Sequence, residues 1–392
     1  MKELFLCFIL VYIVILVLRF YLTQSYFRKN TAILKNMDHE SYLNLKEVTI
    51  FQPILSGDKF LEEKLSYIYD NLDEAQLIWA INKEDQEAER IVKKIINKNL
   101  NKSVYIKKCD DSPFNENPKV YKIISTMEKW RKYVVILDDD TIIDIQRLKE
   151  IEKKILDKNI VTGIPYYLKS DSFYGNLVRA YVNSNSIYNY FTFAKLKKNK
   201  TINGMFYIFK SEKVKSMNFY EKIKFKLCDD YEFAKIAKKN GISIYQSVVP
   251  CKINTEVNSF GELFMLMRRW HIFINHYIKE NFDVNIFLFS VIPFMSGIFL
   301  ILLSIAYKFE VFLLYIFILF INSIFSRKLR REIFKENEGL KDIILEIFSN
   351  ILQIFYWISS LVKSNKIIWR KKVIKIKNEE MEIVRDGKKN KD

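Results

Sequence analysis

Three consecutive carboxylates follow directly after an apolar run in the stretch VVILDDDTII, residues 134–143. Adjacent like charges repel, and each carboxylate also loses hydration when it is half-buried. Asp138 and Asp140 lie two residues apart, so in an extended segment their side chains project to the same side. Carboxylate oxygens presented in this way suit Mg²⁺ or Mn²⁺ together with a diphosphate. We therefore predict a metal- and diphosphate-binding pair, with a solvated acidic turn as the alternative because Asp is common in turns.

Two other acidic motifs fit this stretch poorly. An EF-hand calcium loop needs Gly at its sharp bend, where this sequence has Ile143. A phosphatase-type DxDxT motif needs Thr at position 142, but Thr falls at 141 and Ile at 142.

A second acidic pair, Asp229 and Asp230, opens an amphipathic helix that we expect within residues 227–247. Asp229 suits a helix N-cap, where the helix dipole stabilises a negative charge. Two adjacent acids exceed what a cap needs, so we predict Asp230 as a general base that faces a cleft. Between the two acidic sites, Gly204 in TINGMFYIFK permits close approach of the backbone to a ligand.

A cation pair lies beside an aromatic ring in MLMRRWHIFIN, residues 265–275. Arg269 and Trp270 suit a diphosphate or a sugar, whereas anchoring at a membrane interface is the alternative.

Strand-like and helix-like segments alternate through residues 46–282, which we predict to form one cytoplasmic domain. Strands are expected over residues 47–54, 75–82, 103–108 and 133–141, with helices over 58–71, 86–99 and 117–130. This succession predicts an α/β fold with a mostly parallel sheet and flanking helices. Ligands of such sheets bind at the carboxyl ends of the strands, where Asp85 and Asp138–Asp140 fall.

Three apolar runs are long enough to predict transmembrane helices. An N-terminal anchor is expected within residues 1–24, with a signal peptide as the alternative, although no small-residue cleavage site follows. A tight hairpin of two spans is expected within 284–325. Arg28 and Lys29 follow the first run, and the basic SRKLRRE follows the hairpin. The positive-inside rule therefore places the domain between them in the cytoplasm of a multi-pass cell-membrane protein.

Residues 341–362 are apolar but carry a polar stripe at helical spacing. This stripe predicts an amphipathic helix that lies in the membrane interface instead of a fourth span. A fourth span would also place the basic tail, residues 363–392, outside, against the charge rule.

The net charge of +17 suits either nucleic acid or an anionic membrane surface. Because 49% of the residues are hydrophobic and the apolar runs are long, we predict a membrane partner and no nucleic acid. Four cysteines without paired spacing indicate neither a disulfide framework nor a zinc site.

Several short motifs occur in an order that resembles the inverting glycosyltransferases of family 2, and most nearly their ceramide-glucosyltransferase-like branch. The motifs, in chain order, are FQPILSGD (51–58), Asp85, NPKVYKI (117–123), DDDT (138–141), NGM (203–205), DDYEFA (229–234), RRW (268–270) and IIWRKKVIKI (367–376). The resemblance implies a GT-A-like nucleotide-diphospho-sugar transferase domain with one N-terminal and about two C-terminal transmembrane helices plus an interfacial helix.

The resemblance also implies roles for individual residues. Asp138 and Asp140 match the metal- and diphosphate-binding pair, Asp230 matches the catalytic base, and Asp229 matches its acidic neighbour. Residues implied to contact the nucleotide sugar are Pro53, Asp85, Lys119, Asp138, Gly204, Arg269 and Trp270, with Asp85 at the uracil or ribose. The family motif has Gln or Arg where this chain has Leu266. That departure weighs against a processive polymer synthase more than against a lipid glycosyltransferase.

The predicted function is therefore inverting, Mg²⁺- or Mn²⁺-dependent transfer of a sugar from a nucleotide sugar, expected to be a UDP-sugar, to a lipid hydroxyl. The interfacial helix, the basic tail and a site beside the bilayer favour a lipid acceptor. The aromatic stretch 166–193 fits either a lipid-facing lid or a core helix. Alternatives are a polysaccharide synthase of the same family, an inactive membrane scaffold, and a lipid-phosphate hydrolase.

Overall fold

The computed structural model describes residues 2–35, 39–72, 74–98, 102–113, 115–306, 308–362, 366–369 and 372–375. The chain divides into two compact units, which we describe separately. A sheet unit comprises Asn36–Pro165, Asn199–Asn254 and Ser364–Asp392. A helical unit comprises Met1–Lys35, Tyr166–Lys198 and Thr255–Lys363.

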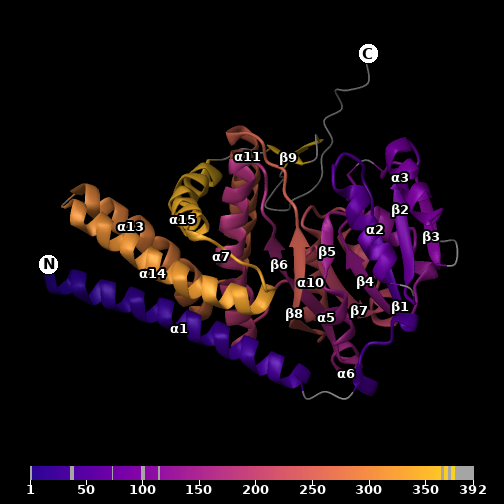
Figure 1. The fold of residues 1–392 in the computed structure, drawn as a ribbon, viewed down its shortest axis with the longest axis horizontal. Coiled ribbons are helices and arrows are strands. Elements are labelled where there is room, and N and C mark those ends of the chain that lie inside the picture. Colours follow the sequence, from indigo (N-terminus) through magenta and orange to yellow (C-terminus); the bar gives the residue numbers. More distant parts are fainter. Residues whose placement is uncertain are drawn as a thin grey trace, which may run out of the picture. The chain divides into compact units, whose positions relative to one another are not determined.

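The sheet unit is built on an eight-stranded mixed sheet in the order β3-β2-β1-β4-β7-β6-β8-β5 (Figure 1). The strands are β1 (Val48–Pro53), β2 (Gln76–Asn82), β3 (Val104–Cys109), β4 (Tyr133–Leu137), β5 (Thr141–Ile143), β6 (Asn159–Tyr167), β7 (Phe206–Lys210) and β8 (Ser243–Ile253). Strands β3, β2, β1 and β4 are parallel, as predicted. Strand β7 runs antiparallel to β4, with Phe206 opposite Leu137. The start of β7 therefore lies beside the carboxyl end of β4.

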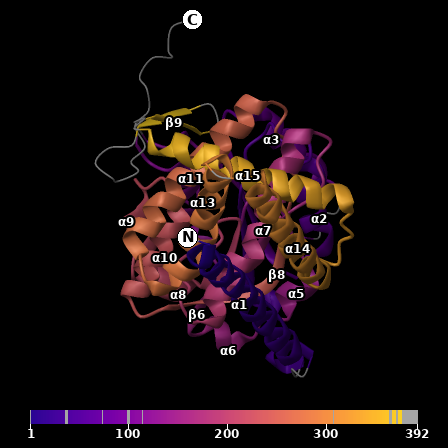
Figure 2. The same ribbon diagram turned by 90° about the vertical axis from the view of Figure 1, so that its left-hand side faces the viewer.

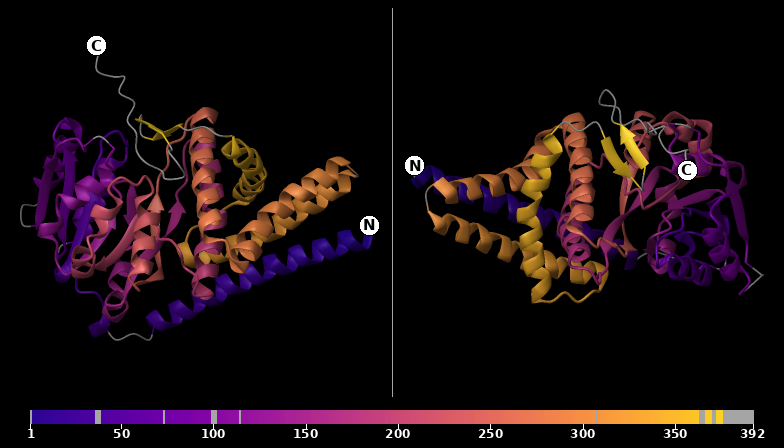
Figure 3. Two further views of the ribbon diagram at one scale, coloured as in Figure 1. Left: turned by 180° about the vertical axis from the view of Figure 1, so that it is seen from behind. Right: turned by 90° about the horizontal axis from the view of Figure 1, so that it is seen from above.

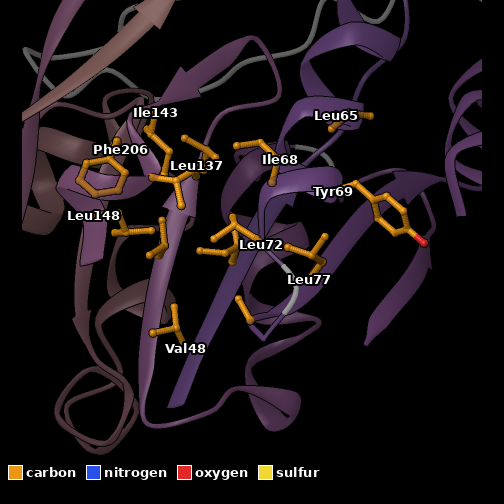
Figure 4. Packing of buried hydrophobic residues seen from close by; sticks show 14 of the residues in the cluster. Val48, Leu65, Ile68, Tyr69, Leu72, Leu77, Leu137, Ile143, Leu148 and Phe206 are labelled. Carbon is orange, nitrogen blue, oxygen red and sulfur yellow. The ribbon is translucent and has the colours of Figure 1, made fainter. Parts of the chain in front are cut away.

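Alternate residues of the central strands enter two separate cores, because successive side chains of a strand point to opposite faces. On one face, residues such as Ile50 and Val135 pack under α2 (Leu61–Asn71) and α3 (Gln86–Ile96). Figure 4 shows this core, including Leu65, Ile68 and Leu77. The other face packs against α4 (Pro118–Ile124), α9 (Phe219–Ile223) and α10 (Asp229–Lys239). Burial on both faces confirms the α/β architecture expected from the sequence.

The remaining short helices of the sheet unit are η1 (His39–Ser41), η2 (Leu45–Glu47), η3 (Met127–Lys129), α5 (Ile145–Lys149), α6 (Lys153–Leu156) and α8 (Ser211–Ser216). The segment predicted as a basic tail lies largely outside the described residues. Its described part is an antiparallel pair, β9 (Lys366–Trp369) and β10 (Lys372–Lys375), seen at the right of Figure 3.

The helical unit contains α1 (Lys2–Lys35), α7 (Phe173–Lys195), α11 (Phe260–Asn281), α12 (Val284–Ile286), the π-helix η4 (Phe287–Val291), α13 (Ile292–Ala306), α14 (Phe309–Phe334) and α15 (Leu340–Leu361). Four stretches within it are long and apolar enough to cross a membrane: Phe5–Ile33, Val284–Ala306, Phe309–Phe334 and Leu340–Leu361. Figure 3 shows α13 and α14 side by side, as the predicted hairpin requires.

Helix α7 belongs to this helical unit and not to the sheet unit. Its Asn189 Oδ1 accepts a hydrogen bond from Arg19 of α1 at 2.6 Å, and Thr192 pairs with Thr23 at 3.1 Å. The Arg19 guanidinium also lies 5.0 Å from the ring of Tyr188. Helix α7 thus packs as a core helix and pairs with polar groups of α1, which supports the core-helix interpretation of stretch 166–193. The domain predicted over residues 46–282 is accordingly divided between the two units.

The polar stripe of α15 faces the protein, which differs from its expected exposure at a membrane surface. Glu346, Ser349 and Gln353 are buried, whereas apolar side chains such as Ile344 and Phe355 are exposed. Ser349 donates a hydrogen bond to the Leu177 carbonyl of α7, and Glu346 accepts one from Arg330 of α14 at 2.8 Å. Figure 2 shows α15 crossing α14. The stripe therefore reflects packing against α7 and α14, and the interfacial placement of this helix stays a prediction.

Candidate active site

Lys119 provides the positive charge that the acidic cluster requires. Its Nζ lies 2.7 Å from Asp138 Oδ1 and 3.7 Å from Asp229 Oδ2, and it donates a hydrogen bond to the Gly204 carbonyl at 2.8 Å. Only 15% of the Lys119 side chain is exposed. Burial alone would lower the pKa of Lys119, but the charges of Asp138, Asp229 and Asp230 outweigh it and raise the pKa above its usual value. The ammonium group thus joins two acidic pairs that are about ninety residues apart in the sequence.

Three segments bring these groups together. Asp138 follows the end of β4, and its amide donates to the Met205 carbonyl at 3.0 Å, next to Gly204. Lys119 lies in the first turn of α4, which Asn117 caps and Pro118 begins. The buried Asn117 also donates to the Lys226 carbonyl at 3.0 Å, which ties α4 to the segment leading into Asp229. Sequence reasoning missed this role of Asn117, although an Asn-Pro pair at a helix start is the signal of a cap.

The three consecutive carboxylates have three different environments. Asp138 pairs with Lys119. Asp139 is buried, and its Oδ2 accepts a hydrogen bond from the Leu55 amide at 2.7 Å. Asp140 accepts a hydrogen bond from the Thr141 hydroxyl at 3.0 Å. The three residues lie in a turn between β4 and β5, in which the Thr141 amide donates to the Asp138 carbonyl at 3.2 Å, instead of in the expected extended segment. A shared direction of the Asp138 and Asp140 side chains therefore stays a prediction.

Charged side chains hold the loop that follows β1. Lys122 donates to the Ile54 carbonyl at 2.8 Å, Asp139 accepts from Leu55, and Asp85 Oδ2 accepts from the Ser56 amide at 2.9 Å. Three successive residues are thus bound by three side chains from different elements. Pro53, the last residue of β1, leads directly into this loop. Sequence reasoning missed Lys122, which lies on the same face of α4 as Lys119 because it is three residues farther along the helix.

Asp85 has a structural role in addition to its expected ligand contact. Its Oδ1 accepts from the Ala88 amide at 3.0 Å and caps α3, while Oδ2 holds Ser56. Burial would raise the pKa of Asp85, but the hydrogen bonds from Ser56 and Ala88 prevail and lower it. The carboxylate therefore fixes the β1 loop against the start of α3.

Asp229 lies at the start of α10 with Asp230. Burial is the main cause that raises the pKa of Asp229 to about 6, although Lys119 acts against it and the charges of Asp230 and Asp138 add to it. Its Oδ2 accepts no hydrogen bond in the described part of the chain. Asp229 does not cap α10 through its side chain, because α10 has no side-chain cap at Cys228 and begins at Asp229 itself.

The absence of a side chain at Gly204 makes room for the carboxylate of Asp230. A Cβ atom at Gly204 would lie 2.7 Å from Asp230 Oδ2 and 3.0 Å from its Cγ. These distances are shorter than real carbon contacts, so any larger residue would displace the carboxylate. Asp230 thus lies close to Gly204, and the expected approach of a ligand to this glycine stays a prediction.

Arg269 and Trp270 lie in α11, which belongs to the helical unit. The Trp270 ring stacks on Tyr181 with centroids 6.0 Å apart and meets Tyr167 edge-on at 6.4 Å. Trp270 is thus fixed within a group of aromatic rings, and its contact with a nucleotide sugar stays a prediction.

The acidic pair suits a metal that is completed by a ligand. Among the residues described, no group of three or more His, Cys, Asp or Glu side chains could hold a metal ion. Mg²⁺ keeps several waters and is commonly bound through one or two carboxylates plus substrate phosphates, so a third protein ligand is not required. Asp138 and Asp140 fit such a donor set. Among the described residues, Lys119 is the only charge partner of Asp138 within 4 Å.

The family model for glycosyl transferase family 21 matches residues 8–382, which span both units. The chain belongs to glycosyl transferase family 21. The family 21 match supports the resemblance to the ceramide-glucosyltransferase-like branch, although the matching model is that of family 21 and not of family 2. No curated protein is significantly similar to this family 21 member.

Several solved structures are distantly similar to the family 21 chain. The mannosyltransferase PcManGT from Pyrobaculum calidifontis, in complex with GDP-Man and Mn²⁺, is 14% identical with a TM-score of 0.46, and the match covers 90% of this chain and 97% of that one. S. aureus TarS 1-349 in complex with UDP-GlcNAc is 14% identical with a TM-score of 0.39, covering 86% of this chain and 99% of that one. GalNAc-T7 with UDP, GalNAc and Mn²⁺ is 8% identical with a TM-score of 0.39, covering 63% and 53%.

Proposed function

We propose that this family 21 glycosyltransferase transfers a sugar from a nucleotide-diphosphate sugar, a UDP-sugar, to a lipid hydroxyl at the cytoplasmic face of the cell membrane, with inversion. The observation that carries the proposal is the convergence of Lys119 with Asp138, Asp229 and Asp230 at the carboxyl edge of the sheet. Four helices long and apolar enough to cross a membrane support a lipid acceptor. Basic residues toward the ends of α1 and α14, among them Arg28, Lys29 and Lys328, support a cytoplasmic site.

The leaving group of the reaction is a nucleoside diphosphate. Asp138 and Asp140 would hold Mn²⁺ or Mg²⁺, which neutralises the charge that develops on the departing diphosphate. The Lys119 ammonium lies 2.7 Å from Asp138 Oδ1 and offers a second, permanent positive charge for the departing diphosphate. In the GT-A-like arrangement that we propose, the β1 loop held by Asp85 and Asp139 binds the nucleoside.

Asp230 acts as the base on the acceptor hydroxyl. It takes the hydroxyl proton while the acceptor oxygen forms the new bond to the anomeric carbon and the bond to the diphosphate oxygen breaks. A positioned base typically contributes about 10²–10⁴-fold to such a step. One displacement with one base inverts the configuration of the sugar.

The test uses membranes that carry the full chain, with Mn²⁺ or Mg²⁺ and a panel of labelled nucleotide sugars. We expect label in the organic-solvent fraction, and its loss in the Asp230→Asn variant. Label in a polymer fraction would instead identify a polysaccharide synthase. Absence of transfer from every donor, with lipids added, would contradict the proposed function.

A further inference from the structure

The two oxygens of the Asp230 carboxylate have unequal surroundings. Oδ1 accepts hydrogen bonds from the Tyr231 amide at 2.7 Å and from the Cys228 thiol, whose Sγ lies 3.3 Å away. Oδ2 faces Gly204 and accepts no hydrogen bond from the described residues. Asp230 is partly exposed. The side chain is therefore held through one oxygen while the other is left available.

The Cys228 thiol is suited to donate a hydrogen bond to this carboxylate because it stays protonated. Burial raises the pKa of the Cys228 thiol well above its usual value, and the charges of Asp230 and Asp229 raise it further. The thiol accordingly stays protonated at neutral pH. The other titratable groups that interact with the charge of Asp230 are Lys119, whose ammonium binds the Gly204 carbonyl, Asp229 and Tyr207.

We propose that Cys228 is a positioning residue which, together with the Tyr231 amide, occupies Asp230 Oδ1 so that Oδ2 is the atom that receives the acceptor proton. This inference rests on the proposed function, because it assigns an atom and an orienting partner to the proposed base. In the step, the acceptor O–H bond breaks and its proton goes to Oδ2. The acceptor oxygen bonds to the anomeric carbon, and the nucleoside diphosphate leaves with the electron pair of the broken bond.

The geometry explains why a thiol serves here. Sulfur is larger than oxygen and reaches Oδ1 at 3.3 Å from a residue two positions earlier, directly before α10 begins. A thiol is a weak donor, so it orients the carboxylate without binding it as tightly as an ammonium group would. Lys119 is directed at Asp138 and Asp229 instead, at 2.7 and 3.7 Å.

The test compares Cys228→Ala and Cys228→Ser in the full chain in membranes, with Cys109→Ala as the matched control. Cys109 is a buried thiol at the end of β3 that contacts Ser125 at 3.4 Å, away from Asp230. The measurements are kcat, the KM for the labelled donor, and the pH profile of transfer.

We expect Cys228→Ala to lower kcat about tenfold, the order expected for one lost hydrogen bond to a charged group, with the donor KM nearly unchanged. The acidic limb of the pH profile should move to higher pH, because a carboxylate that loses a donor binds its proton more readily. Cys228→Ser should restore most of kcat and return the limb toward its original position, since a hydroxyl also donates. Cys109→Ala should leave all three measurements unchanged.

An active wild type with a Cys228→Ala variant of equal kcat and unchanged pH profile overturns the positioning role alone. Equal losses in the Ala and Ser variants, without a shift of the limb, also overturn it, because they indicate lost packing. A wild type that transfers no sugar overturns the proposed function, and the positioning role with it. If the Ala variant does not accumulate in membranes, the Ser variant still tests the role, because it must keep most of the wild-type kcat with the acidic limb near its original position.

Discussion

The Lys119 Nζ lies 2.7 Å from Asp138 Oδ1, and the same ammonium group donates to the Gly204 carbonyl. One side chain of α4 therefore connects the end of β4 with the loop whose glycine faces Asp230. The diphosphate pair and the base that we propose are thus linked through a single cation. Changes at this cation should affect both.

Replacing Lys119 by Met should lower the transfer rate by about 10²–10³-fold, the range found when a preorganised donor at developing negative charge is removed. Asp138 and Asp229 would then repel each other without compensation. The rate is measured as labelled sugar transferred at saturating donor. Lys46→Met is the control, because the Lys46–Glu74 pair is exposed and 3.7 Å apart, a kind that contributes about 0–1 kcal/mol. Equal rates in the two variants would contradict a role for Lys119.

Replacing Gly204 by Ala should abolish most transfer while leaving the chain folded. The new Cβ would lie 2.7 Å from Asp230 Oδ2, so the carboxylate must move away from its position. Displacing a base by about 1 Å typically costs about 10²-fold in rate. Gly57→Ala is not a suitable control because Gly57 has a φ of +108°, whereas Gly261→Ala is, since its nearest neighbour lies 4.0 Å away. Wild-type activity in Gly204→Ala would show that the Asp230 position is not critical.

Chelation with EDTA should stop transfer, and Mn²⁺ or Mg²⁺ should restore it. The reason is that Asp138 and Asp140 supply at most part of a coordination sphere, which the diphosphate completes. Asp140→Asn should therefore require a higher metal concentration for half-maximal activity. The Asp111→Asn variant, which changes an exposed carboxylate bound to Asn82, should follow the wild-type metal curve. Full activity in the presence of excess chelator would rule out the metal.

The sequence predicted the parallel strands and the acidic edge because continuous apolar runs such as VVIL indicate a strand that is buried on both faces. It did not predict that Lys119 neutralises Asp138, because that contact depends on the tertiary position of α4, which Asn117 ties to the Lys226 carbonyl between α9 and α10. A lysine in a helical, charged segment has no periodic signal of its own.

The polar stripe of α15 shows a second limit of prediction from the sequence pattern. Helical spacing identified the face that carries Glu346 and Ser349, but spacing does not reveal whether water, lipid or another helix covers that face. The partners, Arg330 and the Leu177 carbonyl, come from helices α14 and α7, which the sequence pattern does not pair with α15.

A buried ionic network in the helical unit should be essential to its stability. The Arg330 guanidinium donates to Glu338 at 2.7 and 3.0 Å and to Glu346 at 2.8 Å, and it also contacts the Ser326 hydroxyl. Only 3% of Arg330 is exposed. Arg330→Met would leave the buried Glu346 without its ion-pair partner and leave Glu338 with Arg179 at 3.9 Å. Breaking a buried ion pair in this way typically costs about 3–5 kcal/mol.

We therefore expect Arg330→Met to lower the thermal unfolding midpoint in detergent by about 10 °C. Lys328→Met, a change of an exposed residue on the same helix, should leave the midpoint unchanged. Adding Glu338→Gln and Glu346→Gln to Arg330→Met should recover part of the loss, because the uncompensated charges are then removed and the amides remain able to hydrogen-bond. An unchanged midpoint in Arg330→Met would mean that the network adds nothing to stability. A loss that the two Gln changes do not reduce would assign the effect to the packing of the Arg330 stem instead of its charge.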